Sequence, residues 1–496
     1  MKLRFKILFA GIFIVLSGCV LIWAWHARSK GALESYKREL RARGEKLAYR
    51  ELLRATPPPE PEAAKAFMAT NSIFVSISNT APMMRFVAPG RALVSYQQET
   101  LPNYVSTNAW PLLIPELETN RTALLKLREI LQGPALFFNP DYSRNIFLLL
   151  PHLSKLKAAE QLAAYSTIVA LHGHNDPEAW TNLISSVALL HVYQTEPVLI
   201  SQLVEIAMAR IAMSATWEAL QYDRWTEAQL SELQRHWQQV DLFEPAEQTL
   251  AMERDTSIDL FKFVRKSYDG QSGLFSTVEE DGSPAAVTNT VTGMIDRYPK
   301  FWAWKLAWSY QEELVMLKRE QAAVEVCRAT ESTGAFVPAL GDYDVKIAEI
   351  NKQFAKVSAN FLLPPIDAGY RTAIVKLVDA EVGRRLTVTA IALKRFQLRN
   401  GKHPAEVKNL VPEFLEKLPI DLMDGKPLRY QLKPEGAFVL YSVGVDGQDN
   451  GGDATPTEPA TTKYKNWLRG RDVVWPQAAT PEEIALSLTK TNDAIP

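Results

Sequence analysis

The sequence has few of the features that identify a reaction, a redox scaffold or a nucleic-acid partner. Its 496 residues include only two cysteines, Cys19 and Cys327, which excludes a framework of intrachain disulfides. No HExxH, GxSxG, GxGxxG or P-loop pattern occurs. The formal net charge is -1, whereas nucleic-acid binders concentrate basic residues to neutralise phosphates. We therefore expect no nucleic-acid partner, and we interpret Cys327 as a buried structural thiol.

Long polar stretches are also missing. Hydrophobic residues make up 47% of the chain and charged residues 22%, and the 12 tryptophans add further apolar surface for sizeable cores. The length exceeds what one core usually organises, so two or three domains are expected.

One long uncharged apolar run stands near the N-terminus, from Ile7 to Trp25. A helix of about 19 residues spans roughly 28 Å, which is enough to cross the hydrocarbon core of a bilayer. Basic residues precede the run and tryptophans close it, as in membrane helices. We therefore expect membrane attachment through residues 7–25, with the N-terminus inside and the bulk of the chain extracytoplasmic, on the periplasmic side.

The same run contains a competing pattern. Leu16-Ser17-Gly18-Cys19 resembles the lipobox of bacterial lipoproteins, which implies cleavage before Cys19 and a lipid on its sulfur. The chain stays apolar from Val20 to Trp25, however, where a mature lipoprotein usually begins with a polar tether. An uncleaved helix is favoured, lipidated Cys19 is the alternative, and cleavage with release is a third. The first two both leave the chain attached to a membrane.

The chain after this signal-anchor or lipoprotein signal (1–25) divides by composition. Residues 26–62 predict a stalk helix that ends in a Pro-rich linker from Thr56 to Pro61. Residues 63–365 predict an α-helical domain, because apolar residues recur at spacings of three and four. The expected helices cover residues 122–132, 156–172, 177–193, 197–221, 226–239, 245–267, 300–329 and 342–358. Consecutive helical hairpins suggest a tetratricopeptide-like array, although no strict 34-residue repeat is present.

The predicted secondary structure changes after Leu363-Pro364-Pro365, from helices alone to a helix followed by strands. A helix from about 370 to 398 ends at Asn400-Gly401, and residues 427–432 and 437–443 then predict a β-hairpin. The expected fold class is therefore mainly α, with an N-terminal membrane helix, an α-helical array domain and a small C-terminal α+β domain (366–476). Residues 477–496 are expected to form a mobile tail.

Residues 388–475 resemble the C-terminal half of the major pseudopilin of type II secretion systems. The resemblance rests on ordered blocks: ALKRFQLRNGKHP, LVPEFLEKLPID, DGKPLRYQL, FVLYSVGVDGQDNGGD and DVVWP. It implies a pseudopilin-like domain with a calcium-binding Gly/Asp loop. Two features depart from the family. The run from Ile7 to Trp25 lacks the prepilin cleavage site and the glutamate of a filament-forming helix, and Asp421 to Gly425 replaces an Asp-Pro-Trp-Gly turn.

The calcium ligands that this resemblance implies are Asp446, Asp449, Asn450 and Asp453. Calcium prefers carboxylate, amide and carbonyl oxygens, and the neighbouring glycines let a short loop fold around an ion. The spacing is not that of an EF-hand, so an ordinary solvated turn is the alternative.

Two further clusters have both a functional and a structural interpretation. His172, His174 and Asp176 could supply transition-metal ligands, but a polar helix-to-helix loop explains them more simply. Trp302, Trp304 and Trp308 favour core packing over a ligand groove or sugar platform.

The sequence therefore favours a membrane-anchored, non-enzymatic scaffold or binding protein with a protein partner. One alternative is an accessory of a type II secretion or pilus-like system. Another is an enzyme with a site in the helical domain, near the expected long loop from Gly270 to Thr292.

Overall fold

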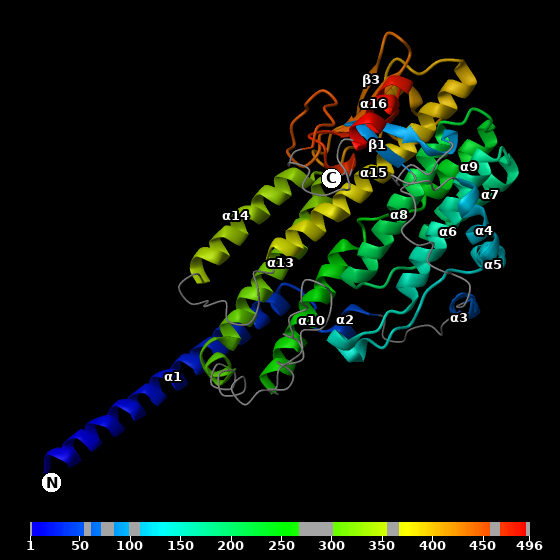
Figure 1. Cartoon of the computed structure of the whole chain (residues 1–496). Coiled ribbons are helices and arrows are strands. Elements are labelled where there is room, and N and C mark those ends of the chain that lie inside the picture. The colour runs from blue at the N-terminus through cyan, green and yellow to red at the C-terminus, as the bar shows by residue number, and fades with distance from the viewer. Residues whose placement is uncertain are drawn as a thin grey trace.

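The computed structural model describes residues 2–53, 61–70, 84–98, 110–266, 301–354, 367–456 and 467–492. Within these ranges the fold is mainly helical, as the sequence predicted, and carries two three-stranded sheets (Figure 1). Three predicted features lie outside the described residues: the Thr56–Pro61 linker except for Pro61, the long loop from Gly270 to Thr292, and the boundary at Leu363-Pro364-Pro365.

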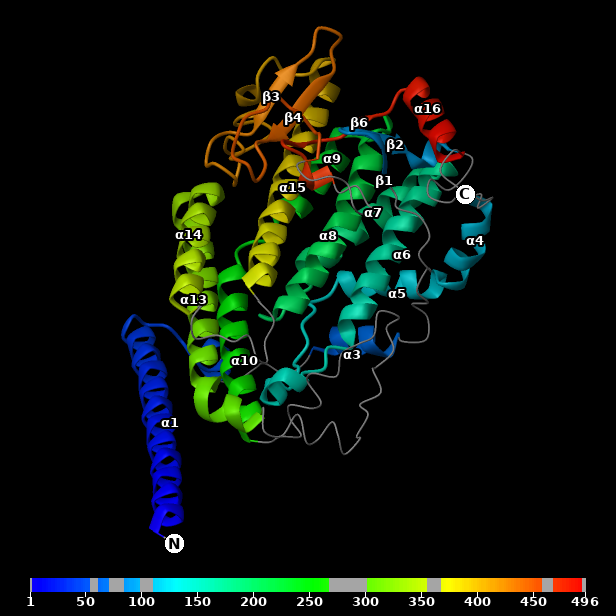
Figure 2. The ribbon, with the colours of Figure 1, turned by 60° about the vertical axis from the view of Figure 1, so that its left-hand side comes forward.

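The longest helix, α1 (Lys2–Ala42), contains 41 residues. Its N-terminal half projects from the body, with the N-terminus at the free end (Figures 1 and 2). Its C-terminal half packs on α13 (Ser309–Thr333), where Leu33 and Leu40 are fully buried. The stalk predicted after residue 25 is thus a helix packed against the body up to Ala42, because its leucines meet Leu314 and Leu317 there.

The body consists of long helices packed side by side. On one side α6 contacts α7 and α8, and on the other α10 contacts α13, which contacts α14 (Figure 2). Helix α15 joins the two sides, since it packs on α8, α9 and α13. The bounds are α6 (His152–His172), α7 (Asp176–Val192), α8 (Leu199–Leu220), α9 (Glu227–Gln238), α10 (Ala246–Lys266), α14 (Phe336–Phe354) and α15 (Asp367–Asn400).

These helices confirm most of the helical segments that the sequence predicted, within a few residues at each end. Helix α14 begins at Phe336 rather than at residue 342, and residues 355–358 of that predicted helix lie outside the described residues. The capping chemistry explains the boundaries. Thr226 and Gln229 form a reciprocal capping box before α9, and the Asn175 side chain accepts a hydrogen bond from the backbone N–H of Glu178 at the start of α7. Helix α15 ends where Gly401 adopts a φ of 71°.

Shorter elements lie around the long helices. They are α2 (Tyr49–Leu52), α3 (Glu62–Ala69), α4 (Trp110–Thr119), α5 (Arg121–Leu131) and α16 (Pro481–Asn492), with the short helices η1 (Ser95–Gln97), η2 (Tyr142–Phe147), η4 (Val407–Leu410) and η5 (Trp467–Arg469). A π-helical turn, η3 (Trp304–Trp308), leads into α13.

The predicted hairpin is confirmed as β3 (Arg429–Leu432) and β4 (Phe438–Ser442), which are antiparallel with Tyr430 opposite Leu440. Strand β5 (Val473–Val474) completes this sheet. A second sheet, which the sequence did not predict, joins β1 (Met84–Ala88) and β2 (Arg91–Val94) to β6 (Gln477–Ala478).

One hydrophobic core runs through both parts of the chain that the sequence separated at residue 366. It includes residues from Ala64 to Trp475 and is continuous through α15. Polar bonds also cross the division: the Gln234 side chain donates to the carbonyl of Phe414 at 2.7 Å. The segment predicted as a separate C-terminal domain therefore shares its core with the helical body.

The C-terminal tail has more regular structure than the sequence predicted. Gln477 donates its backbone N–H to the carbonyl of Gly90, so β6 pairs in parallel with β2, and α16 follows. The buried indole N–H of Trp217 donates a hydrogen bond to the carbonyl oxygen of Pro476 at 2.7 Å. A strand of two residues is too short to show a recognisable alternation of apolar and polar residues. Its partner strand, β2, also lies far away in the sequence, so no local pattern connects the two strands.

Candidate functional site

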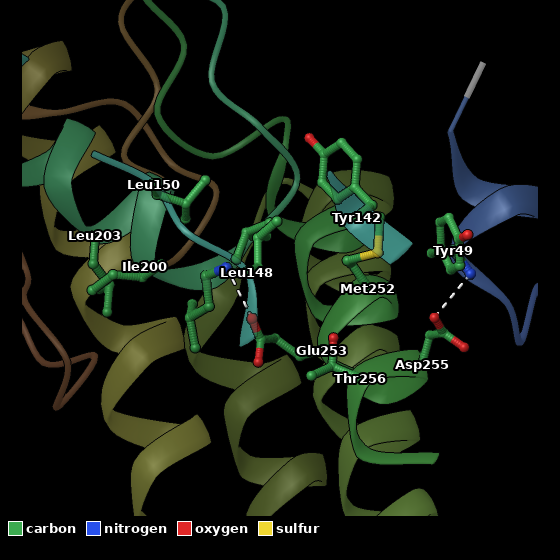
Figure 3. A pocket seen from close by; sticks show the side chains of 12 residues that line it. Tyr49, Tyr142, Leu148, Leu150, Ile200, Leu203, Met252, Glu253, Asp255 and Thr256 are labelled. Atoms are coloured by element: carbon green, nitrogen blue, oxygen red, sulfur yellow. Dashed lines mark hydrogen bonds between the residues drawn. The ribbon is translucent and has the colours of Figure 1, made fainter. Parts of the chain in front are cut away.

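A pocket of about 410 Å³ opens between η2, the N-terminus of α8 and the middle of α10 (Figure 3). Its walls are mostly apolar, with Leu148, Leu150, Ile200, Leu203 and Met252 among the lining residues. Ile200 remains 52% exposed, so the pocket presents apolar surface to the outside. An apolar cavity with a few polar groups is the usual form of a ligand site.

Two carboxyl groups of α10 supply the acidic part of the pocket. Glu253 accepts a hydrogen bond from the backbone N–H of Leu199 at 3.0 Å, and Asp255 accepts one from that of Tyr49 at 2.9 Å. Figure 3 shows the two side chains pointing to opposite sides, toward α8 and α2 respectively. Residues two apart on a helix do not face each other, so these groups are not a convergent acid/base pair.

Burial controls the protonation of both carboxyl groups. It raises the pKa of Glu253 above its ordinary value, against the opposing hydrogen bond from Leu199. It also raises the pKa of Asp255 to about 6, with a smaller contribution from the nearby charge of Asp259. Above pH 6 the ionised Asp255 therefore offers a cation-attracting charge on an otherwise apolar wall.

A buried polar cluster lies close to the pocket. His152 Nε2 is 2.9 Å from Glu196 Oε1, and the Tyr193 hydroxyl donates to Glu196 Oε2 at 2.6 Å. The three side chains are at most 4% exposed, and Phe138 stacks on the imidazole. Because no substrate could reach the imidazole without opening the core, this cluster serves to position α6 against the loop before α8.

A pair of histidines from two helices also meets in the fold, and the sequence pattern did not predict it. His191 on α7 and His236 on α9 stack, with Nε2 of the first 2.7 Å from Nδ1 of the second. Burial and the neighbouring His236 lower the pKa of His191 to about 4. Their separation by 45 positions in sequence explains why periodicity could not reveal them.

The predicted calcium ligands lie in one loop after β4, but their side chains do not converge. Asp446 and Asp453 each accept a hydrogen bond from a backbone N–H two residues further on. Asp449 accepts bonds from the Tyr441 hydroxyl at 2.9 Å and from the N–H of Gly451 at 3.0 Å. The Asn450 amide donates to Asp446. Each carboxylate thus stabilises its own turn.

The residue that organises this loop is Asp472, which the sequence did not single out. Its fully buried carboxylate accepts the backbone N–H groups of Asn450, Gly452 and Asp453, at 3.3, 2.7 and 3.0 Å. In the part of the chain that the structure describes, no three acidic, histidine or cysteine side chains lie close enough together to hold a metal ion. Calcium bound by all four predicted ligands would therefore require the aspartates to leave these turn hydrogen bonds and reorient.

The other candidate residues have structural environments. Nδ1 of His172 donates a hydrogen bond to the backbone carbonyl oxygen of Tyr96 at 2.6 Å. His174 lies in the following turn with a φ of 53°. Trp304 is 1% exposed in the core, while Trp302 is 41% exposed. Cys327 is buried, and burial raises the pKa of its thiol, consistent with a structural role.

Comparisons with known proteins identify no protein similar to this chain. No family model matches this chain, and neither the curated proteins nor the solved structures contain a match.

Proposed function

We propose that this chain is a membrane-anchored, extracytoplasmic binding protein whose body is held directly at the bilayer by α1. The observation that carries the proposal is the way α1 changes its surroundings along its length. Residues of the apolar run are exposed, Phe13 by 71% and Leu21 by 70%, whereas Ser29, Leu33 and Leu40 are buried against the body. An apolar helix surface without protein neighbours suits a bilayer.

The contacts after Cys19 support the uncleaved helix over the lipoprotein. The Trp25 indole donates to the carbonyl of Ala307, and the His26 ring donates through Nδ1 to that of Leu306. A lipoprotein tether would be polar and extended at this point, whereas here the chain remains helical from Lys2 to Ala42.

The binding role is proposed to use the pocket between α8 and α10. Its apolar walls and its two acceptor carboxyl groups favour an apolar ligand or partner side chain that carries an amine. Because the carboxyl groups diverge, the geometry favours binding over two-carboxyl catalysis, and an enzyme remains the weaker alternative.

A second candidate concerns the C-terminal segment. Helix α15, η4, the turn from Asp421 to Gly425, the β3–β4 hairpin and the Asp/Gly loop follow in the order of the pseudopilin C-terminal half. This order supports the proposal of a pseudopilin-like module with a calcium site at Asp446, Asp449, Asn450 and Asp453, and of an accessory role in a secretion or pilus-like machine.

A reporter fused to the C-terminus tests the anchor proposal. A reporter that is active only outside the cytoplasm should show activity in cells and should sediment with membranes. The double variant Phe13→Lys/Leu21→Lys should lose both properties, because charges at the centre of a membrane helix oppose insertion. Activity confined to a cytoplasmic reporter would contradict the proposal.

Ligand titration tests the pocket. At pH 7.5 the full chain should bind benzylamine more tightly than benzyl alcohol or benzoate, and the preference should fall as the pH drops below 6 and Asp255 takes up a proton. Leu203→Trp should block all three probes by filling the cavity, whereas Asp255→Asn should remove only the preference for the amine. Equal binding of the three probes would contradict the acidic site.

A further inference from the structure

Exposed apolar and basic side chains gather at the end of the body where α1 enters it. We call this set the basal surface; it comprises Arg144, Phe147, Lys262, Lys266, Trp302 and Leu306. Phe147 is 54% exposed, and Trp302 and Leu306 are each 41% exposed. In Figures 1 and 2 the lower ends of α10 and α13 point the same way as the free half of α1, and β3 lies at the opposite end.

The contacts of α1 show where this surface lies along the helix: it is level with the C-terminal end of the apolar run. Trp25, the last residue of the run, is hydrogen-bonded to Ala307 at 2.8 Å, and His26 contacts the carbonyl of Leu306 at 2.9 Å. From Ile7 to Trp25 the helix rises roughly 27 Å, the thickness of a hydrocarbon core. If this run crosses the bilayer, η3 lies at its surface.

Cross-helix contacts place the end of α10 at the same level. Arg265 donates to the carbonyl of Ser309 at 3.2 Å, and the rings of Phe261 and Trp304 stack with centroids 6.5 Å apart. From there the Phe263 ring meets that of Phe147 edge to face at 5.5 Å. The basal surface thus extends from η3 across α10 to η2.

The chemistry of this surface matches the interface of an anionic membrane. A groove of about 590 Å³ between η2 and α10 is lined by Arg144, Lys262 and Lys266 beside the rings of Phe147 and Phe263. Asp259, which also lines it, pairs with Lys262 at 2.8 Å, so positive charge remains in excess. On η3, Lys305 lies 4.8 Å from the centre of the Trp302 ring. Aromatic and basic side chains together are typical of proteins at lipid headgroups.

We propose that the basal surface rests on the bilayer, with its aromatic and leucine side chains in the interface and its basic groove on anionic lipid headgroups. The proposal rests on the anchoring by α1 proposed above. It adds that the body has a fixed orientation, with the β3–β4 hairpin directed away from the membrane.

Depth measurements on the full chain test this arrangement. In a Cys19→Ser background, single spin labels are placed at Leu306→Cys, Phe147→Cys, Ile14→Cys and Leu432→Cys, and the protein is reconstituted into nanodiscs containing phosphatidylglycerol. Leu432 on β3 is the matched control, because it is a leucine with 40% exposure at the far end of the body. Collision rates with oxygen and with a water-soluble nickel chelate then report the depth of each label.

Labels at Leu306 and Phe147 should collide several-fold less with the nickel chelate than the label at Leu432, and the label at Ile14 should be shielded most. A water-like value at Leu306 or Phe147, with Ile14 still shielded, would overturn the docking and leave the anchor intact. A water-like value at Ile14 would overturn both. Shielding at Phe147 that is equal in nanodiscs of phosphatidylcholine alone would overturn the role assigned to the anionic headgroups.

Discussion

The indole nitrogen of Trp25 donates a hydrogen bond to the carbonyl oxygen of Ala307, 2.8 Å away, at the point where the apolar run ends and the folded body begins. This bond joins the proposed membrane segment to the π-helical turn that leads into α13.

Leu40→Ala should loosen α1 from the body. Leu40 is fully buried in a small cluster with Leu317 and Ile258, and truncation of a buried leucine typically costs about 2–5 kcal/mol. Hydrogen exchange of residues 29–42 in the full chain should accelerate accordingly. Leu486→Ala, at a side chain that is 57% exposed on α16, is the control and should change little. Unchanged protection in Leu40→Ala would contradict the packing described for α1.

Stability should fall as the pH rises from 5 toward 8, because Glu320 is buried with its proton. Burial raises its pKa to about 8, although the hydroxyl groups of Ser257 and Tyr370, at 2.5 and 2.8 Å, oppose the shift. The unfolded chain releases this proton near pH 4.5, so between the two pKa values the folded state binds more protons and each pH unit costs up to about 1.4 kcal/mol.

Glu320→Gln should flatten that part of the pH dependence in denaturant titrations at several pH values. Glu435→Gln, at an exposed position in the turn between β3 and β4, is the control and should keep the slope of the native chain. A slope that is the same in Glu320→Gln as in the native chain would show that Glu320 is not the responsible group.

Asp421→Ala should unfold the turn that replaces the Asp-Pro-Trp-Gly motif. The fully buried carboxylate accepts the N–H groups of Met423 and Val443, each at 3.0 Å, and lies 2.9 Å from Arg429. Removing one partner of a buried ion pair costs about 3–5 kcal/mol. Proteolysis should become faster within residues 415–450, whereas Asp223→Ala, at a side chain that is 87% exposed elsewhere in the fold, should not accelerate it. Equal cleavage of the two variants would refute the role of Asp421.

Calcium should stabilise the full chain if the loop after β4 closes around an ion. At a hundredfold excess over the dissociation constant, binding adds about 2.7 kcal/mol, which appears as a higher melting temperature. Asp449→Ala should abolish the effect, and Asp223→Ala, at an 87% exposed acid elsewhere, should preserve it. The full chain is required because the module shares the core of the body. No calcium-dependent shift, or the same shift in Asp449→Ala, would exclude this site.

The elements that local pattern determines could be predicted from the sequence. Apolar spacing identified α6 to α10 and α13 to α15, and the Lys433-Pro434-Glu435-Gly436 turn between alternating arms identified the β3–β4 hairpin, because these signals lie within about twenty residues.

Relationships between distant residues could not be predicted in this way. Three relationships depend on the tertiary fold: the β2–β6 pairing, the contact of His191 with His236, and the hydrogen bonds from three backbone N–H groups to Asp472. The candidate pocket is of the same kind, since Tyr49, Ile200 and Glu253 meet only when α2, α8 and α10 pack together.

Whether an intact α1 holds the body at a membrane can be read from the N-terminus of the mature chain. The protein is purified from membranes washed with alkaline carbonate, and its N-terminal peptide is analysed by mass spectrometry. We predict a chain that stays in the washed membranes and retains the residues before Cys19. A chain that begins at an acylated Cys19, or one released by the wash, would contradict it.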